Sequence, residues 1–272
     1  MVHATHRWIE GAGAIQPGTD AAEEFGSFGA GSYITFPMAT MYGARSIHIG
    51  SDTLIGRRCS LLVGYSPDDA QVPDRGIVIG DRCVIGAGST LIAHESITVG
   101  DDVWFGQNVF VSDASHGYQD PETPIGLQLG PHLPVVVGAG SWIGHGVIVL
   151  PGAQIGRHVV VGAGSVVRGV VPDHAVVAGV PARVVRRHEP GLGWAATSDP
   201  SDVRPAWTAA DVAAIMAGDA AQPVGASSTT PEVATTESGS SASRSSSSAG
   251  GGATASSFSA PAPPPTLARR LL

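Results

Sequence analysis

Residues 137–167 read VGAGSW-IGHGVI-VLPGAQ-IGRHVV-VGAGSV-V, and every block of six opens on an aliphatic side chain. A period of six matches neither the turn of an α-helix, about 3.6 residues, nor the plain two-residue alternation of a strand. It is the period of a parallel β-helix, whose coils have three flat faces with one hexapeptide on each. About eighteen residues then make one coil, with the aliphatic side chains stacked inside and small residues at the corners.

The same rhythm is present through most of the upstream sequence. Clear coils begin at five aliphatic residues, namely Ile49, Ile79, Val99, Val137 and Ile155. A weaker coil precedes them at Phe28, Ile34 and Thr40, and a partial coil follows through Val177. Seven coils at about 4.8 Å each give a prism about 30 Å long. The sequence therefore predicts an all-β protein built on a single-stranded parallel β-helix.

The repeat divides the chain of 272 residues into four segments. Residues 1–25 lack the rhythm and are interpreted as a lead-in segment, whereas residues 26–188 carry the β-helix. Residues 189–221 are predicted to form a linker with a short helix that Thr208 caps. Residues 222–272 are rich in Ser, Ala, Pro and Gly, and they have too few large apolar side chains to offset the entropy of ordering. This tail is therefore predicted to be disordered.

The composition excludes several classes of protein. Charged side chains make up 14% of the chain, and the formal net charge is −8. A general nucleic-acid binder needs Lys and Arg clustered over a broad face, so this class is not expected. The first residues, MVHATHRWIEGAG, show no basic segment followed by an apolar stretch, and no run of about 18 apolar residues occurs. We therefore expect a cytoplasmic protein without a membrane span.

Two insertions interrupt the hexads, one at residues 66–76 and one at residues 112–134. A regular solenoid has no structural need for either segment, and long loops on a rigid scaffold are where binding and catalytic residues concentrate. The second insertion contains His116. An unperturbed histidine pKa of about 6.5 leaves the imidazole neutral and basic near neutral pH. His116 is therefore the leading candidate for a general base.

The hexads and the second insertion resemble a known family. The matching stretches are NVFVSDASH (108–116), SWIG (141–144), IGRHVVVGAGSVV (155–167) and VAGVPARVVR (177–186). They are similar to those of the left-handed β-helix acetyltransferases, notably the galactoside and maltose O-acetyltransferases and related enzymes of exopolysaccharide synthesis. The resemblance implies a left-handed winding, acetyl-CoA as cosubstrate without a metal, and a homotrimer with active sites between neighbouring subunits.

The resemblance also assigns roles to residues around the reaction. His116 matches the general base, and Asn108 matches an asparagine on the acceptor side of the catalytic site. Trp142 matches a tryptophan that lines the site. Tyr118 and Asp113, which flank His116 in the insertion, are further candidates for binding the substrate.

The coenzyme positions lie later in the sequence. Ala163 matches the place where the pantetheine arm runs along the backbone. Arg168, Arg183 and Arg186 match basic positions near the nucleotide phosphates, which a guanidinium fork binds well. One feature departs from the family, because the helical N-terminal region of the maltose and galactoside enzymes is not recognisable in residues 1–25.

The expected reaction is direct transfer of an acetyl group to a hydroxyl of a sugar or of a glycosylated intermediate. One alternative is a catalytically silent β-helix that binds a partner. Another is a zinc enzyme similar to the γ-type carbonic anhydrases, which needs three convergent imidazoles, two of them on one strand about five residues apart. His145 is followed at that spacing by Leu150, so the zinc alternative is the weaker one.

Overall fold

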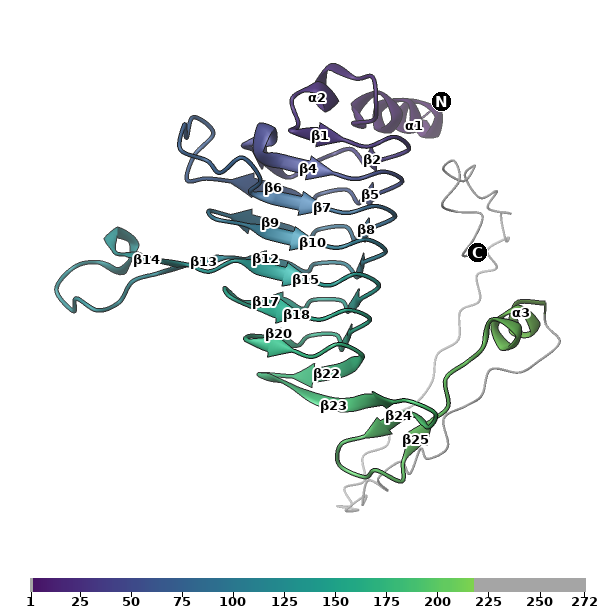
Figure 1. Ribbon diagram of the computed structural model, residues 1–272. Helices are drawn as coiled ribbons and strands as arrows, with labels where there is room; N and C mark the ends of the chain where they lie inside the picture. Colours follow the sequence, from purple (N-terminus) through teal and green to yellow (C-terminus); the bar gives the residue numbers. More distant parts are fainter. Residues whose placement is uncertain (1, 218–272) are drawn as a thin grey trace, which may run out of the picture. The chain divides into compact units, whose positions relative to one another are not determined.

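A computed structural model describes residues 2–217, apart from the side chains of residues 2–4, 6 and 7. The chain separates into two compact units, the first ending at Ala206 and the second beginning at Trp207. All the described strands belong to the first unit, whose coils stack into a prism (Figure 1). The tail 222–272, which is predicted to be disordered, lies outside the described residues.

Parallel strands from successive coils form the three faces of this prism. Face 1 contains β1 (Ser27–Phe28), β4 (Ile47–Ile49), β7 (Ile77–Ile79), β10 (Ile97–Val99), β15 (Val135–Val137), β18 (Gln154–Ile155) and β21 (Val170–Val171). Face 2 contains β2 (Tyr33–Ile34), β5 (Leu54–Ile55), β8 (Val84–Ile85), β11 (Trp104–Phe105), β16 (Trp142–Ile143), β19 (Val160–Val161) and β22 (Ala175–Gly179). Face 3 contains β3 (Thr40–Tyr42), β6 (Ser60–Val63), β9 (Thr90–Ala93), β12 (Phe110–Ser112), β17 (Ile148–Val149) and β20 (Val166–Val167). The seven strands of face 1 agree with the seven coils expected, and the arrangement fits a left-handed β-helix.

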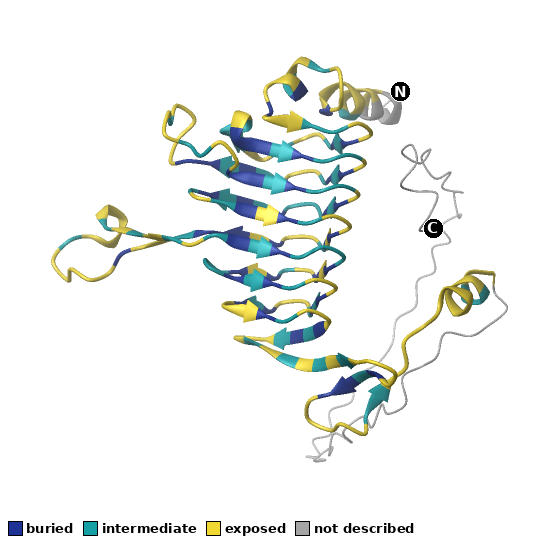
Figure 2. Ribbon diagram, viewed as in Figure 1, coloured by how far each residue is buried: buried dark blue, intermediate teal, exposed yellow. Residues whose placement is uncertain are grey.

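The aliphatic residue that opens each hexad points into the prism. Every hexad position of the five clear coils is buried, and Figure 2 shows this burial alternating with exposure along the strands. On face 2, Ile143 is aligned with Phe105 of the preceding coil and with Val161 of the following one. The Gly106 N–H donates to the Ile143 carbonyl at 2.7 Å, so backbone groups are satisfied from coil to coil. The predicted hexad register is confirmed.

The first coil departs from the predicted register at one position. Met41, not Thr40, is aligned with Leu61 of the next coil, and Thr40 is exposed. Ile34 keeps its expected place opposite Ile55. The shift arises because the connection after Ile34 is one residue longer than a hexad. The prediction for Thr40 was therefore wrong by one residue.

Left-handed residues turn the chain from one face to the next. At the corner between faces 1 and 2, positive φ angles fall on Asp52, Arg82, Asp102, Gly140, His158 and His174. At the corner between faces 2 and 3, they fall on Arg58, Gly88, Asn108, Gly146 and Gly164. Each corner therefore carries one left-handed residue per coil, either a glycine or a residue with a side chain. Inside the corners, Cys59 and Cys83 are buried and free, and burial raises the pKa of the Cys83 thiol to about 11.

The lead-in segment is helical, which the sequence analysis did not predict. α1 spans Val2–Gly13 and α2 spans Asp20–Glu23, with the Thr19 side chain accepting the Ala22 N–H at 3.3 Å. Ile15 and Phe25 join the hydrophobic core of the prism. α1 has no acidic residue in its first turn and ends in a glycine-rich sequence, so the usual helix signals are weak.

Three antiparallel strands extend face 2 beyond the last coil. They are β23 (Ala182–Glu189), β24 (Gly193–Ala196) and β25 (Val203–Arg204). Residues 193–204 were predicted to be linker, and for them that prediction was wrong. In β23, partly buried and exposed residues alternate every two positions. This period differs from the hexad, so the six-residue pattern does not reveal these strands.

The second unit contains the short helix expected after Thr208. α3 spans Ala209–Ala217. The Asp211 N–H donates to the Thr208 hydroxyl at 3.2 Å, and the Thr208 N–H donates to the Asp211 carboxylate at 2.7 Å. This reciprocal pair is a capping box, which satisfies backbone donors at the start of the helix.

Candidate functional site

His116 lies on a β-hairpin formed by the second insertion. β13 (Ala114–His116) pairs with β14 (Leu129–His132), and a 3-10 turn, η2 (Ile125–Leu127), lies between them. The hairpin extends away from the prism (Figure 1). His116 is exposed opposite Leu129, and among residues 2–217 its imidazole has no hydrogen bond, ion pair or ring contact. The imidazole therefore faces solvent.

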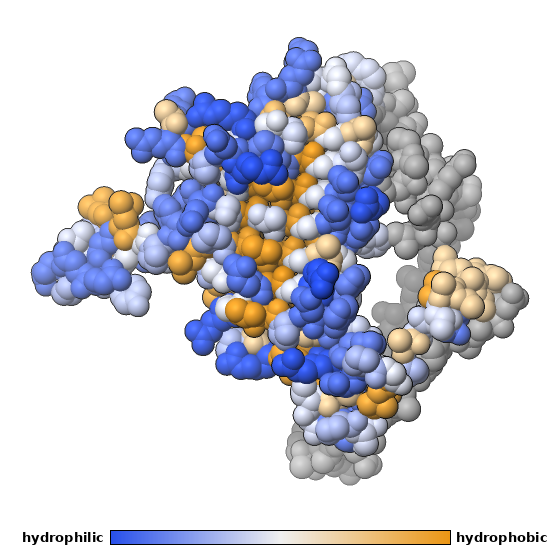
Figure 3. Space-filling view, viewed as in Figure 1, coloured by the Kyte–Doolittle hydropathy of each residue, from blue (hydrophilic) through white to orange (hydrophobic). Residues whose placement is uncertain are grey.

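The far part of the hairpin carries an unusually apolar surface. Ile125, Leu127 and Leu129 are 50%, 75% and 82% exposed, and Tyr118 is 77% exposed. Figure 3 shows apolar residues at the far end of the hairpin, among polar ones. Apolar side chains gathered on a projecting segment mark an interaction surface. We call the segment 114–132 the arm.

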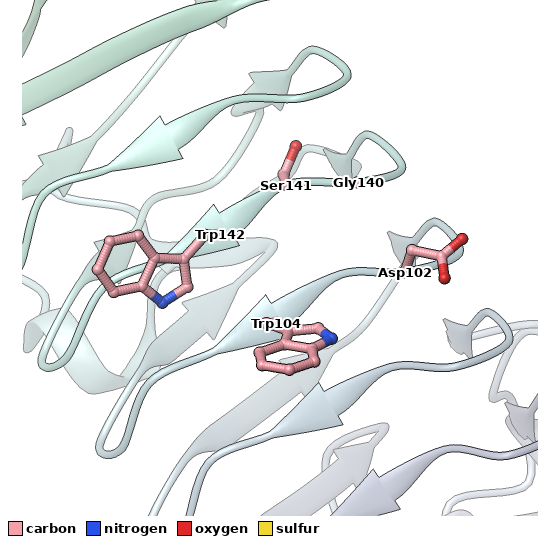
Figure 4. A pocket seen from close by; sticks show the side chains of 5 residues that line it. All are labelled: Asp102, Trp104, Gly140, Ser141 and Trp142. Carbon is pink, nitrogen blue, oxygen red and sulfur yellow. The ribbon is translucent and has the colours of Figure 1, made fainter. Parts of the chain in front are cut away.

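A second feature lies on face 2. A pocket of about 310 Å³ is lined by Asp102, Trp104, Gly140, Ser141 and Trp142 (Figure 4). Trp104 and Trp142 are aligned on neighbouring strands and are 37% and 54% exposed. Gly140 is the left-handed residue of this coil, and a Cβ there would lie 2.6 Å from His158 Nδ1, so a larger residue would clash with the His158 ring. We call this pocket the tryptophan pocket.

One carboxylate lines the tryptophan pocket, and it is paired with an arginine. The Asp102 carboxylate accepts hydrogen bonds from Arg82 Nε at 2.7 Å and Arg82 Nη2 at 2.8 Å. These bonds hold the pKa of Asp102 below its usual range, so the group is anionic at neutral pH. Sequence analysis missed Trp104 and Asp102. Trp104 holds the same place in its hexad as Trp142, one residue before the buried position, and that register is the signal that identifies it.

The remaining predicted site residues are exposed but dispersed. Asn108 and Ala163 lie at the corner between faces 2 and 3, Arg168 follows β20, and Arg183 lies on β23. Trp142 is on face 2, whereas the arm with His116 continues from face 3. Within one chain, His116 and Trp142 therefore belong to different faces and make no contact.

Asp113 does not have the surface position expected of a substrate-binding residue. Its side chain is fully buried. Its carboxylate accepts the His94 N–H at 2.9 and 3.0 Å and the Glu95 N–H at 2.8 Å. The prediction for Asp113 was wrong because these backbone groups already occupy the carboxylate, which anchors the start of the arm to the prism.

Arg186 is likewise committed to the structure. Its side chain is 13% exposed, donates to the carbonyls of Trp194 and Asp202 at 3.1 and 3.0 Å, and pairs with the Asp202 carboxylate. It therefore ties β23 to the strands that follow. The prediction that Arg186 contacts coenzyme phosphates was wrong.

Asp113→Ala is expected to lower the free energy of unfolding by about 1.5–3 kcal/mol, because the part-buried N–H groups of His94 and Glu95 lose their carboxylate acceptor. Asp68→Ala is the matched control, since this exposed carboxylate lies in the first insertion and its loss should change stability by less than about 0.5 kcal/mol. Urea unfolding of both variants measures the difference. Equal midpoints for the two variants would contradict the anchoring role.

The described residues offer no set of ligands for the zinc alternative. Across residues 2–217, no three His, Cys, Asp or Glu side chains are grouped so that they could hold a metal ion. In the same part of the chain, no helix has the length and apolar character needed to cross a membrane.

Comparison with known proteins decides the family. Two family models match, bacterial transferase hexapeptide over residues 134–169 and hexapeptide repeat of succinyl-transferase over residues 76–113. A putative acetyltransferase of Schizosaccharomyces pombe is 33% identical over 153 residues, which cover 52% of this chain and 73% of that protein. The chain belongs to the hexapeptide-repeat acetyltransferase family.

The chain is also similar to the putative lipopolysaccharide biosynthesis O-acetyl transferase WbbJ of Escherichia coli. It is 36% identical over 122 residues, or 42% of this chain, and the chain spans 62% of WbbJ, less than two thirds. The solved structure of AntD, an N-acyltransferase from Bacillus cereus in complex with dTDP and 3-hydroxybutyryl-CoA, matches with a TM-score of 0.53 and 23% identity. That match covers 64% of this chain and 92% of AntD and shows a shared fold.

Proposed function

We propose that this protein transfers an acetyl group from acetyl-CoA to a hydroxyl of a sugar or of a glycosylated molecule, with His116 as the general base. The observation that carries the proposal is the unengaged imidazole of His116, presented on an exposed arm of a hexapeptide-repeat acetyltransferase. The naming of WbbJ as a lipopolysaccharide O-acetyl transferase supports a saccharide acceptor and oxygen as its nucleophilic atom.

His116 acts on the acceptor. Its neutral imidazole takes the hydroxyl proton while the acceptor oxygen attacks the thioester carbonyl carbon, the carbon–sulfur bond breaks, and the proton ends on the released thiol. Backbone N–H groups near the reacting carbonyl stabilise the charge that develops on its oxygen. A covalent intermediate on the protein is not required, and neither buried cysteine is placed to form one.

The corner around Ala163 suits an extended pantetheine arm. Ala163 is exposed between two glycines, and a Cβ on Gly164 would meet no atom within 4 Å. The backbone there is open to a ligand that hydrogen-bonds along it. Arg168 and Arg183 are exposed, and neither forms an ion pair within the described part of the chain. Their guanidinium groups are therefore available to the phosphates of the coenzyme.

We place the reaction between copies of the chain. His116 lies on the arm and Trp142 lies on face 2, so one chain by itself does not unite them. A closed three-fold assembly brings the arm of each copy to face 2 of the next, which covers the apolar surface of the arm. This arrangement supports a homotrimer whose catalytic sites combine His116 of one copy with Asn108 and the tryptophan pocket of another.

The test is acetyl transfer by the purified protein with acetyl-CoA and a panel of sugars, each paired with its deoxy and amino analogues. Released thiol and a mass gain of one acetyl group on the hydroxyl form are the expected results. Transfer to the amino analogue alone would replace the O-transfer proposal with N-transfer. Failure to bind the coenzyme, together with no thiol release from any acceptor, would favour a silent scaffold.

Arg183→Ala is expected to raise the KM for acetyl-CoA about tenfold with little change in kcat, since it removes one charge-assisted contact to a part of the substrate remote from the reaction. Arg187→Ala is the matched control, an exposed arginine on the same strand, and should leave both constants unchanged. Steady-state kinetics with acetyl-CoA as the varied substrate measures the effect. Equal KM values for Arg183→Ala and the wild type would remove Arg183 from the site.

A further inference from the structure

Three aromatic side chains from successive coils meet beside the base of the arm. Tyr65 directly precedes the first insertion, His94 lies in the turn between β9 and β10, and His132 ends β14. The ring centroids of Tyr65 and His94 are 4.3 Å apart, and those of His94 and His132 are 5.0 Å apart. The Tyr65 hydroxyl lies 2.8 Å from His132 Nε2 and donates to it when that nitrogen is unprotonated. We call these three residues the aromatic clip.

Both strands of the arm are held at the same turn of the prism. The first strand is anchored by Asp113, whose buried carboxylate accepts the N–H groups of His94 and Glu95. The second strand is anchored by His132, which contacts the His94 ring and the Tyr65 hydroxyl. An isolated two-stranded hairpin is only marginally stable, so these contacts at its base determine how the arm is oriented.

The surroundings of His94 in the clip favour its uncharged form. Burial lowers the pKa of His94, the nearby Asp113 carboxylate opposes this shift, and His132 adds to it. His94 Nδ1 is buried and has no hydrogen-bond partner in the described part of the chain, which favours a neutral ring. The uncharged His94 ring packs against the His132 ring with the two centroids 5.0 Å apart.

We propose that the aromatic clip orients the arm and thereby places His116, so that Tyr65 and His132 are positioning residues for acetyl transfer. This inference rests on the proposed function. Ala114, two residues before His116, pairs with His132 across the hairpin, so a change at His132 is transmitted along β13 to the imidazole. The ring of Tyr65, directly before the first insertion, contacts the arm through His132.

Tyr65→Phe removes only the hydroxyl and keeps the ring on His94. This variant and His132→Ala are each expected to lower kcat about 10- to 100-fold with the KM for acetyl-CoA unchanged, since misplacement of a catalytic group by about 1 Å costs this much. The double variant should lose no more than the worse single variant, because both remove the same contact. His132→Gln restores an acceptor for the Tyr65 hydroxyl and should recover part of kcat.

Hydrogen–deuterium exchange gives a readout independent of activity. Both variants should exchange faster at amides 114–132, with the rest of the prism unchanged. His174→Asn is the matched control. It removes another imidazole contact of the prism, the stack with His158 at 5.3 Å, and retains a residue that tolerates the left-handed corner. This control should leave kcat and arm exchange at wild-type values.

The two proposals fail in different ways. Wild-type kcat or unchanged arm exchange in Tyr65→Phe overturns the clip, even if the protein is an active acetyltransferase. A wild-type protein that transfers acetyl to no acceptor overturns the proposed function. In that case the exchange data still decide the clip, because faster exchange confined to the arm supports it and unchanged exchange overturns it.

Discussion

His116→Ala is expected to lower kcat by about 10²- to 10⁴-fold, the contribution of a positioned general base, while the affinity for coenzyme A and the oligomeric state stay unchanged. We expect only kcat to change because His116 is exposed on the arm and makes no contact with the prism. Steady-state kinetics, calorimetric titration with coenzyme A and light scattering measure the three quantities.

The matched control for His116→Ala is Glu122→Ala, which truncates another exposed side chain of the same arm. It should retain wild-type kcat, so that a general disturbance of the arm is separated from loss of the base. If His116→Ala keeps more than about a third of wild-type kcat with a good acceptor, the assignment of the general base is contradicted.

Ile143→Asp is expected to abolish soluble expression. Ile143 is fully buried in the column between Phe105 and Val161, and an unpaired carboxylate there costs several kcal/mol. Such a cost is a large share of the total stability of a domain, which is about 5–15 kcal/mol. Ile143→Val keeps the shape of the column and should cost only about 0.5–1.5 kcal/mol.

The control for Ile143→Asp is the same kind of change on an outward side chain. Val170 on β21 is 81% exposed, and Val170→Asp should remain soluble. Soluble expression and thermal melting separate the variants. Soluble, active Ile143→Asp protein would show that the side chain points outward and would refute the hexad register.

The fold of the coils follows from the sequence because each hexad repeats the same physical requirement. A buried aliphatic side chain such as Ile143 is aligned with the equivalent residue of the next coil, and the same buried position recurs every six residues along the sequence. The hexad pattern is less regular in the first coil and after the last coil. At Met41 the connection is one residue longer, and from β23 onward the pairing is antiparallel, so two-residue alternation replaces the hexad.

The candidate site is less visible in the sequence because it depends on contacts between distant segments. His116 stands out as a polar residue in an insertion, but the burial of Asp113 three positions earlier depends on N–H groups in the preceding coil. The aromatic clip joins Tyr65, His94 and His132, and no local pattern relates these three residues. Only the stacking of coils brings them to one corner.

The central claim is that His116 of one copy acts at the tryptophan pocket of another, and subunit complementation tests it most directly. His116→Ala and Trp142→Ala chains carrying different tags are coexpressed, and mixed assemblies are isolated through both tags. Each variant alone should be nearly inactive. In every mixed trimer, one of the three sites between subunits combines an intact His116 with an intact Trp142, so activity should recover toward about a third of the wild-type value. Mixed assemblies no more active than either variant alone would contradict a catalytic site shared between copies.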